Sequence, residues 1–526
     1  MFRKKLLALL LCMLIIITSV GCGSTKDNAD ANTDSTNQES TENNTMVIGV
    51  RDDSRVIHPL YGDDRTTLTL INNIFSTLFD VNGENIEYNL AEKVERSDDY
   101  LEYTLKLKDN LKWHDDKKIT SDDIIFSLET ILDEKQASLS RDNFVTSSGP
   151  VKFEKVDDLT VKLTLPEVDI SFLGKIGDLR IFPKHIYGGI ENIQTSDVNQ
   201  TPIGSGPYKW DSRKSGESIT LTRFDDYFKG QPHLEKIIYR VLPDSNTSTA
   251  AFKNKEIDVK YIYPEDVDTF KKDGAKILAF DEDRVGYIFM NQNNEALKNK
   301  EIRQAICYAI DRLELLKARY ISTEYAHPAK TFLAEKALYL NDEVNDYAYN
   351  PEKSKELIKN SGLKNIKFNL AFIGKNDTEG LLIQKYLNDV GIEVELKPMD
   401  AGAFFNALYS PDTNDVFDLA LNGYIYGKDP SDYAQVFKTD SPNNLLKYSN
   451  PEIDKLWDNA ATEIDSSKRE LIYKDIQKKI MDDAPIFPIS YGYAIVVVNP
   501  KFEGLEDAKP APIHMFDDLS KIYISK

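Results

Sequence analysis

Apolar and polar residues alternate in two short segments of the first half of the chain. The alternation runs through 103–107 and again through 161–165, and a period of two predicts strands with one buried face. Between them, Thr120 and Asp123 have the spacing of a capping box, and apolar residues follow at helical spacing through 124–131. That combination predicts an amphipathic helix between the two strands.

Strands and helices alternate in the second half of the chain. The pattern predicts a strand, a helix, a strand, a short helix and a strand over 366–372, 381–390, 392–396, 404–408 and 416–421. This order implies a parallel sheet with helices on its faces. Ligands of such sheets bind outside the carboxyl ends of the strands. A site is therefore expected where the third strand ends, at Asn422-Gly423-Tyr424.

Two further helices are indicated in the same half. Apolar residues recur at helical spacing through 301–320, which predicts one helix there. Asn450-Pro451 provides a cap and a first-turn proline ahead of a second helix over 452–462. The apolar stripes of both helices are interpreted as core-packing faces. The chain as a whole is expected to be a mixed α/β protein.

The start of the chain has the layout of a secretory signal. Basic residues at 3–5 precede an apolar run over 6–17, which is too short for a comfortable membrane span of about 20 residues. Small residues at 19–21 stand directly before Cys22, which resembles the bacterial lipobox. The resemblance implies a signal peptide over 1–21 and a diacylated Cys22 that anchors the chain to a membrane. Ser19 departs from the leucine that the lipobox prefers, and an ordinary cleaved signal is the alternative.

A polar segment follows Cys22. Residues 23–45 are almost entirely Ser, Thr, Asn, Asp, Glu, Gln, Lys and Ala, without aromatic or branched aliphatic side chains. Such a segment buries too little apolar surface to offset its chain entropy. We therefore expect residues 22–45 to be the lipid anchor and a disordered tether, with folded sequence beginning near Met46.

Composition limits the size class and the partners. About 480 residues follow the tether, which is more than one core comfortably supports, so at least two lobes are expected. With 65 basic against 86 acidic residues, the net charge is −21. That charge argues against nucleic acid as a partner and against electrostatic docking on anionic lipid.

Cysteine and histidine usage gives no sign of catalysis. Cys307 is the one cysteine outside the signal and the lipidation position, so the mature chain has no intramolecular disulfide. Metalloprotease, hydrolase and phosphate-loop motifs are absent, and the six histidines lack metal-ligand spacing. His114 is interpreted as a surface-turn residue. We expect no enzyme activity, no cofactor and no metal.

Several motifs together resemble one family. They run in the family's order through the mature chain and include Pro202–Tyr208 for "GTGPY", Phe224–Pro232 for "N.dYw.g.P", Glu256–Asp258 for "GeiD" and Glu301–Arg312 for "vRqAl.yAiDR". The chain is similar to the peptide/nickel class of extracellular solute-binding proteins, the oligopeptide-binding subunits of ABC importers. One of these motifs alone would be weak, whereas the ordered set is specific.

The resemblance implies a two-lobed, type II periplasmic-binding-protein-like fold with an additional α+β domain inserted in the first lobe. Lobe I would comprise 46–80, 198–290 and 488–526, the extra domain 81–197, and lobe II 291–487. Hinge strands would cross near Met290-Asn291 and near Ser490. In this fold the lobes close on a solute, and the closed form docks on the transporter.

The resemblance also implies a ligand and a site. Short peptides would pair through their backbone with the segment 422–430, which includes Gly423, Tyr424, Ile425, Tyr426, Gly427 and Asp429. This segment resembles the "GWSLGxDP" variant of the family. Tyr426 stands where many members carry an Asp that binds the ligand's ammonium, and Asp63 or Asp64 could substitute for it. For Tyr424, cleft exposure and core burial are equally open, and Asp429 is interpreted first as a turn residue.

Weaker site candidates and partners complete the expectation. Tyr261 and Tyr287 would face the cleft from lobe I by analogy. The partners would be short peptides, an ABC permease with its ATPase subunits, and a membrane through the lipid on Cys22. The protein would be a monomer on the extracellular or periplasmic face of the cell membrane. A nickel-type metal-chelate carrier and a peptide-sensing receptor without transport are the alternatives; for the former, Arg284 lies near the segment.

Overall fold

The computed structural model describes residues 44–83, 85–374, 378–409 and 416–525. Residues 44–526 form one compact unit. The predicted signal peptide, Cys22 and the tether up to residue 43 lie outside the described residues. Strand β1 (Thr45–Val50) begins one residue before the predicted start of folded sequence near Met46, and Thr45 pairs there with Lys236 of β12.

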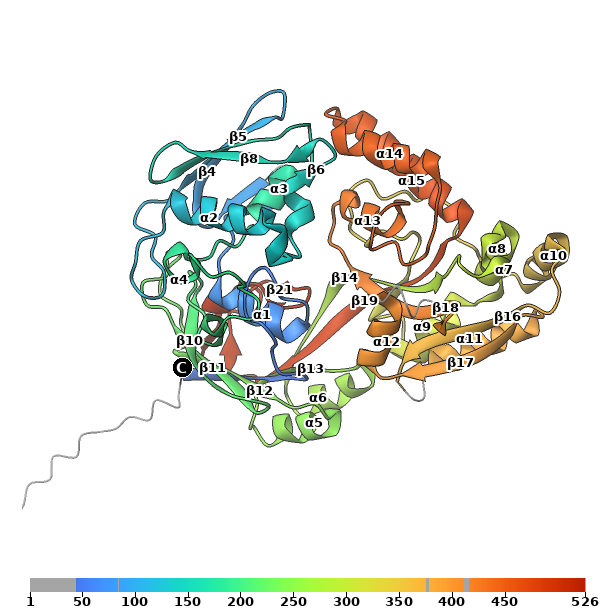
Figure 1. The fold of residues 1–526 in the computed structure, drawn as a ribbon. Coiled ribbons are helices and arrows are strands. Elements are labelled where there is room, and N and C mark those ends of the chain that lie inside the picture. The colour runs from blue at the N-terminus through green and yellow to red at the C-terminus, as the bar shows by residue number, and fades with distance from the viewer. Residues whose placement is uncertain (1–43, 84, 375–377, 410–415, 526) are drawn as a thin grey trace, which may run out of the picture. The chain divides into compact units, whose positions relative to one another are not determined.

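A large mixed sheet runs through the unit. Its strands, in spatial order, are β10 (Tyr208–Lys214), β11 (Ser218–Arg223), β12 (Lys236–Val241), β1, β13 (Val259–Tyr261), β19 (Ile486–Val498), β14 (Lys276–Met290), β18 (Leu419–Ile425), β16 (Lys367–Ile373) and β17 (Glu393–Met399), with β15 (Ala326–Pro328) beside β19. The long strands β14 and β19 pair with each other along most of their length and lie at its centre (Figure 1).

A smaller antiparallel sheet lies within the predicted extra domain. Its order is β4 (Ala91–Arg96), β5 (Glu102–Leu107), β9 (Thr160–Thr164) and β8 (Lys152–Lys155). Short pairs elsewhere are β2 (Phe79–Asn82) with β3 (Asn85–Tyr88), β6 (Val145–Thr146) with β7 (Gly149–Pro150), β20 (Phe502–Glu503) with β23 (Tyr523–Ile524) and β21 (Pro510–Ala511) with β22 (Met515–Phe516). The predicted strands at 103–107 and 161–165 are confirmed as β5 and β9.

Helices cover the sheets. They are α1 (Arg65–Ile74), α2 (Ser121–Leu132), α3 (Phe172–Gly177), α4 (Lys184–Tyr187), α5 (Ser245–Lys253), α6 (Val267–Lys272), α7 (Glu295–Lys298), α8 (Lys300–Ala309), α9 (Arg312–Tyr320), α10 (Pro351–Ser361), α11 (Thr378–Asp389), α12 (Ala401–Tyr409), α13 (Ala434–Phe437), α14 (Pro451–Thr462) and α15 (Ser466–Asp483). Two predicted starts are confirmed: the Thr120 backbone N–H donates to the Asp123 carboxylate at 2.9 Å, and Asn450 caps α14.

The single helix predicted over 301–320 is wrong. The chain breaks into α8 and α9 at Ile310-Asp311, where Ile310 adopts an extended conformation. The Asp311 carboxylate accepts from the backbone N–H groups of Leu313 and Glu314 and so begins a new helix. The apolar spacing continues across this break, which is why periodicity alone joined the two helices.

The predicted parallel unit is confirmed, with one change at its third strand. Strand β16 pairs in parallel with β17 and with β18. The third strand was expected over 416–421, but β18 begins at Leu419 and continues to Ile425. The extension exists because residues 419–425 pair antiparallel with β14, a strand far away in the sequence.

Two large apolar cores lie along the central strands. One contains residues from β1, α1, the smaller sheet and the C-terminal segment, and the other contains residues from the parallel unit and from α8, α14 and α15. Met290 and Ser490, the predicted crossing points, lie within or beside the second core. The β14–β19 register is irregular at two places, between Asp281 and Arg284 and between Gly286 and Tyr287. The exact lobe boundaries stay predictions.

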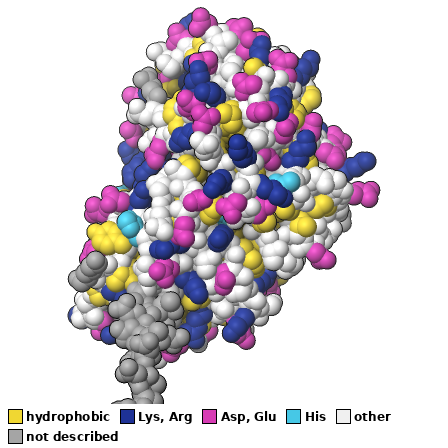
Figure 2. All heavy atoms as spheres, turned by 90° about the vertical axis from the view of Figure 1, so that its left-hand side faces the viewer, with side chains coloured by type: hydrophobic (Ala, Val, Ile, Leu, Met, Phe, Trp, Pro, Cys, Tyr) yellow, Lys and Arg dark blue, Asp and Glu magenta, His cyan; other side chains and the backbone are white. Residues whose placement is uncertain are grey.

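The surface carries mixed charge. On the face drawn in Figure 2, acidic and basic side chains are interspersed rather than gathered in one patch. Among the described helices, none combines the length and apolar character that a membrane span requires.

Candidate functional site

Strand β18 offers one free edge at the expected ligand position. Residues 419–425 pair on one side with β14, whereas β16 pairs on the other side only with Leu419 and Ala420. From Leu421 to Ile425, no strand of the described residues occupies that second side. An exposed backbone edge is a template for pairing with another extended chain. The structure thus places Gly423, Tyr424 and Ile425 on a strand with donors and acceptors available.

A cluster of tyrosine side chains packs against one face of this strand. Ring centroids lie 4.9 Å apart for Tyr287 and Tyr424, 4.9 Å for Tyr424 and Tyr426, and 5.5 Å for Tyr424 and Tyr433. Tyr424 is buried, and its hydroxyl donates to the Phe332 carbonyl at 2.6 Å. Burial raises the pKa of the Tyr424 phenol well above its ordinary value, so it stays neutral. Tyr424 is therefore a core residue that holds the strand, while Tyr426 is only half-buried.

The turn after β18 is shaped by Gly427 and Asp429. Gly427 has a φ of +87°, a conformation that favours glycine. The Asp429 carboxylate accepts from the Ser431 backbone N–H at 2.9 Å, which agrees with the interpretation of Asp429 as a turn residue. The Tyr433 hydroxyl donates to the Gly427 carbonyl at 2.9 Å and ties the turn to the tyrosine cluster. Asp429 is thus engaged in the protein itself.

Two other predicted residues lie on different elements and have partners. Tyr261, on β13, accepts a hydrogen bond from the Arg65 guanidinium at 2.7 Å, and Arg65 also pairs with Glu282 at 2.6 Å. Asp63 pairs with Arg55 at 3.0 Å, and Asp64 caps α1. Within the described residues, the hydrogen bonds and ion pairs of Asp63 and Tyr261 are made with residues other than those of β18, so the structure does not gather all predicted residues in one place.

Arg284 is the residue beside β18 that the site prediction omitted. It pairs with Ile425 in the β14–β18 ladder, and its guanidinium lies over Gly423, where a Cβ atom would overlap it. The side chain is half-buried and has no hydrogen-bond or ion-pair partner among the described residues. The proximity of Arg284 was evident from the sequence, but its position over Gly423 and its lack of a partner were not.

Two carboxylates near the turn have unusual environments. Asp432 follows the turn, and loss of surrounding water raises its pKa to about 7, with the Asp429 charge adding to the rise. Asp178, at the end of α3, is exposed on one side, yet surrounding protein removes enough water to raise its pKa to about 6. Asp178 also acts on Asp432, and Lys175 opposes the effect.

We expect the empty protein to lose stability as pH rises through this range. Asp432 binds a proton more tightly in the folded state, with a pKa of about 7 against 3.8, so its penalty is absent below pH 4 and complete above pH 7. Replacing Asp432 by Asn should raise the unfolding free energy at pH 8 by on the order of 1–2 kcal/mol and leave it unchanged at pH 4.

Urea unfolding at both pH values measures this effect. The matched control is Asp440→Asn, which removes an exposed carboxylate from the same region and should change stability little at either pH. An equal gain for Asp432→Asn at both pH values would contradict the assigned environment. The groups that face Asp432 are Asp429, Lys175, Asp178 and Asp169.

His114 lies in a turn, as predicted, but it is half-buried and its ring is engaged by backbone groups. Its ring contacts the Gly206 carbonyl at 3.0 Å and accepts from the Gly204 backbone N–H at 3.2 Å. Burial lowers the pKa of His114 to about 4, so the ring is neutral. His114 therefore joins the segment after β5 to the Gly204-Ser205-Gly206 turn. Cys307 is free and buried.

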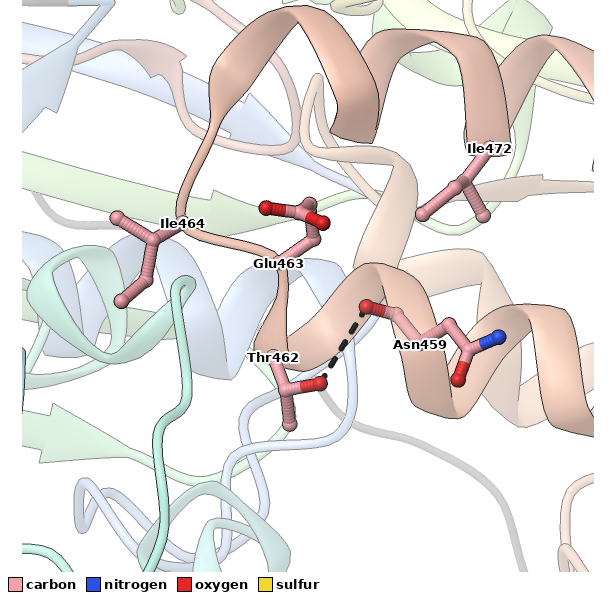
Figure 3. Close-up of a pocket in the computed structure, with 5 residues that line it drawn as sticks. All are labelled: Asn459, Thr462, Glu463, Ile464 and Ile472. Carbon is pink, nitrogen blue, oxygen red and sulfur yellow. Dashed lines mark hydrogen bonds between the residues drawn. The ribbon is translucent and has the colours of Figure 1, made fainter.

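A small hollow elsewhere is not part of this site. It has a volume of about 370 Å³ and lies at the corner between α14 and α15. Figure 3 shows Asn459 and Thr462 on α14, Glu463 and Ile464 in the connection, and Ile472 on α15. Its polar groups bond locally, as when the Thr462 hydroxyl donates to the Asn459 carbonyl at 3.4 Å. It is a gap between helix ends rather than a built binding site.

Comparisons with known proteins agree on one family. The model of bacterial extracellular solute-binding proteins, family 5 Middle, matches residues 85–444. Oligopeptide-binding protein AppA of Bacillus subtilis (strain 168) is 26% identical over 558 residues, covering 100% of both chains.

Two solved structures share the fold over nearly the whole chain. The ABC transporter substrate binding protein CtaP from Listeria monocytogenes is 42% identical, with a TM-score of 0.87, over 92% of this chain and 100% of that one. AppA from Bacillus subtilis in complex with a nonapeptide is 26% identical, with a TM-score of 0.80, over 92% of this chain and 99% of that one.

Proposed function

This chain belongs to the bacterial extracellular solute-binding proteins of family 5, and we propose that it captures short peptides for an ABC importer. The observation that carries the proposal is the free edge of β18 from Leu421 to Ile425. A peptide of almost any sequence offers N–H and C=O groups at the spacing of such an edge. Backbone pairing therefore suits a carrier of mixed peptides.

The surroundings of β18 offer contacts for the side chains of a bound peptide. Half-buried Tyr426 and the exposed aromatic pair Phe405 and Tyr409 on α12, with ring centroids 6.3 Å apart, offer apolar contact for ligand side chains. The relatives are solute-binding proteins, and we infer that this chain likewise acts without catalysis.

The membrane attachment is part of the same proposal. The lipid on Cys22 and the tether would hold the folded unit near a permease and its ATPase subunits, on the extracellular or periplasmic face. Paired acyl chains give stable anchoring where one chain does not. The folded unit would act as a monomer and engage the transporter with its ligand bound. A peptide-sensing receptor would use the same cleft and is distinguished by the absence of peptide uptake.

A thermal-shift assay with defined ligand pools tests the proposal. An equimolar pool of tri- to nonapeptides should raise the unfolding temperature, because a ligand that binds only the folded state stabilises it by mass action. The free amino acids at the same total composition, and Ni²⁺ with L-histidine, should give no comparable rise. Stabilisation by the nickel mixture alone would instead support a metal-chelate carrier. Uptake of a binding peptide by cells with and without the protein then separates transport from sensing.

A further inference from the structure

We propose that Arg284 binds a carboxylate of the peptide ligand, an inference that rests on the proposed function. Its guanidinium lies over Gly423 on the strand whose other edge is free, so it stands beside the path of a paired peptide. A carboxylate is the group that a planar guanidinium binds with two parallel hydrogen bonds.

The lack of a protein partner points to a ligand. Nearly every other arginine near the central strands is engaged: Arg65 with Glu282, Arg319 with Glu379 and Arg312 with backbone carbonyls. Arg284 has no such partner among the described residues although it is half-buried. A partly desolvated cation without an acceptor is costly. An incoming carboxylate would remove that cost, which favours carboxylate-bearing peptides over neutral ones.

The acidic residues next to Arg284 in the sequence do not neutralise it. Asp281 faces Lys336 at 3.4 Å, and Glu282 pairs with Arg65. Burial raises the pKa of Asp283, with Lys336 and Lys428 as the cations that oppose the rise. Burial raises the pKa of the Tyr287 phenol, and the Arg284 charge opposes that rise. In the β14–β18 register, Arg284 and Gly423 lie on the face of the sheet opposite to Tyr287 and Tyr424, and no carboxylate of the described residues pairs with Arg284.

The absence of a side chain at Gly423 makes room for the Arg284 guanidinium. Any side chain at 423 would overlap the guanidinium, so the glycine lets the charged group lie flat against β18. Because the obstructing atoms are the end of a flexible side chain, Gly423→Ala would push the guanidinium aside without disturbing the strand. This variant should therefore weaken carboxylate binding while leaving the fold intact.

The test compares matched peptides by isothermal titration calorimetry. The probes are the peptides of the tri- to nonapeptide pool as free acids and as carboxy-terminal amides, and Glu-containing peptides against their Gln counterparts. We expect the wild type to prefer one carboxylate-bearing form by about tenfold or more, as for a charge-assisted pair. Arg284→Gln should reduce that preference to below about threefold, and Arg284→Lys should keep part of it. The amide and Gln arms show whether the carboxylate is terminal or on a side chain.

Arg240→Gln is the control. It also removes one positive charge, but from β12, where Arg240 pairs with Glu256 at the surface. This variant should keep the full preference for the carboxylate-bearing peptide. The inference is overturned if the wild type shows no preference in either arm. It is also overturned if Arg284→Gln keeps the preference, or weakens acids and amides equally. Absence of binding by every peptide overturns the proposed function itself, a result distinct from binding without preference.

Discussion

Methylation of a bound peptide's backbone nitrogens is expected to weaken binding in an alternating pattern. In a strand paired along β18, every second N–H points at the protein and the others point away. Each inward N–H that is methylated loses a hydrogen bond of about 1–1.5 kcal/mol and adds bulk at the edge, so two such changes should cost about 100-fold in affinity. Methylation of the outward nitrogens should cost little.

The reason lies in the protein's own pairing. Residues 421–425 are held in an extended conformation by pairing with β14. The hydrogen bond from the buried Tyr424 hydroxyl to the Phe332 carbonyl also holds the strand in place. The free edge is therefore already extended before a ligand binds, and the peptide is the part that must adopt the extended conformation. Titration calorimetry with singly and doubly methylated versions of one binding peptide measures the pattern. A flat profile along the peptide would show that side chains, rather than backbone, carry the affinity.

Gly204→Ala is expected to destabilise the fold by about 2–4 kcal/mol. A Cβ atom at 204 would overlap the Ile74 carbonyl oxygen at the end of α1, a backbone atom that cannot move aside easily. The same turn is held from the other side by His114, whose backbone N–H donates to the Gly204 carbonyl at 2.9 Å. The turn thus fixes α1, the helix that carries Arg65, against the first core.

Gly174→Ala provides the matched control for this prediction. Gly174 lies in α3, and a Cβ atom there would meet open space, so alanine should be neutral or slightly stabilising. Urea unfolding followed by tryptophan fluorescence suits the comparison, because buried Trp113 adjoins His114. Equal stabilities for the two variants would show that the Gly204 turn yields to an added methyl group and does not clamp α1.

The parallel unit was predictable because its signals are local. Alternating strands and helical stripes between 366 and 421 identified β16, α11, β17 and α12. The break at Ile310-Asp311 was not predicted, since the apolar spacing continues across it and only the Asp311 cap ends the helix. The extension of β18 was also missed, because it depends on β14, whose partner residues lie more than a hundred positions away.

The role of the segment 422–430 as the ligand site stays a prediction, but its place in the fold can be compared with the sequence. Gly423, Tyr424 and Ile425 lie within the third strand, which was expected to end at residue 421, and the turn with Gly427 and Asp429 follows it. The environment of each residue in the segment could be learned only from the structure. Tyr424 is buried, Asp429 caps a turn, and Tyr426 is half-buried. The partnerless state of Arg284 depends on where every other charge lies, which no single-sequence pattern contains.

The identity of the natural ligand tests the central proposal most directly. Protein purified from its own cells, denatured and desalted, should release a mixture of short peptides with little sequence preference when analysed by mass spectrometry. That result is expected because backbone pairing along β18 is indifferent to most side chains. Release of a metal chelate or a sugar, together with no thermal shift from any peptide pool, would contradict peptide capture.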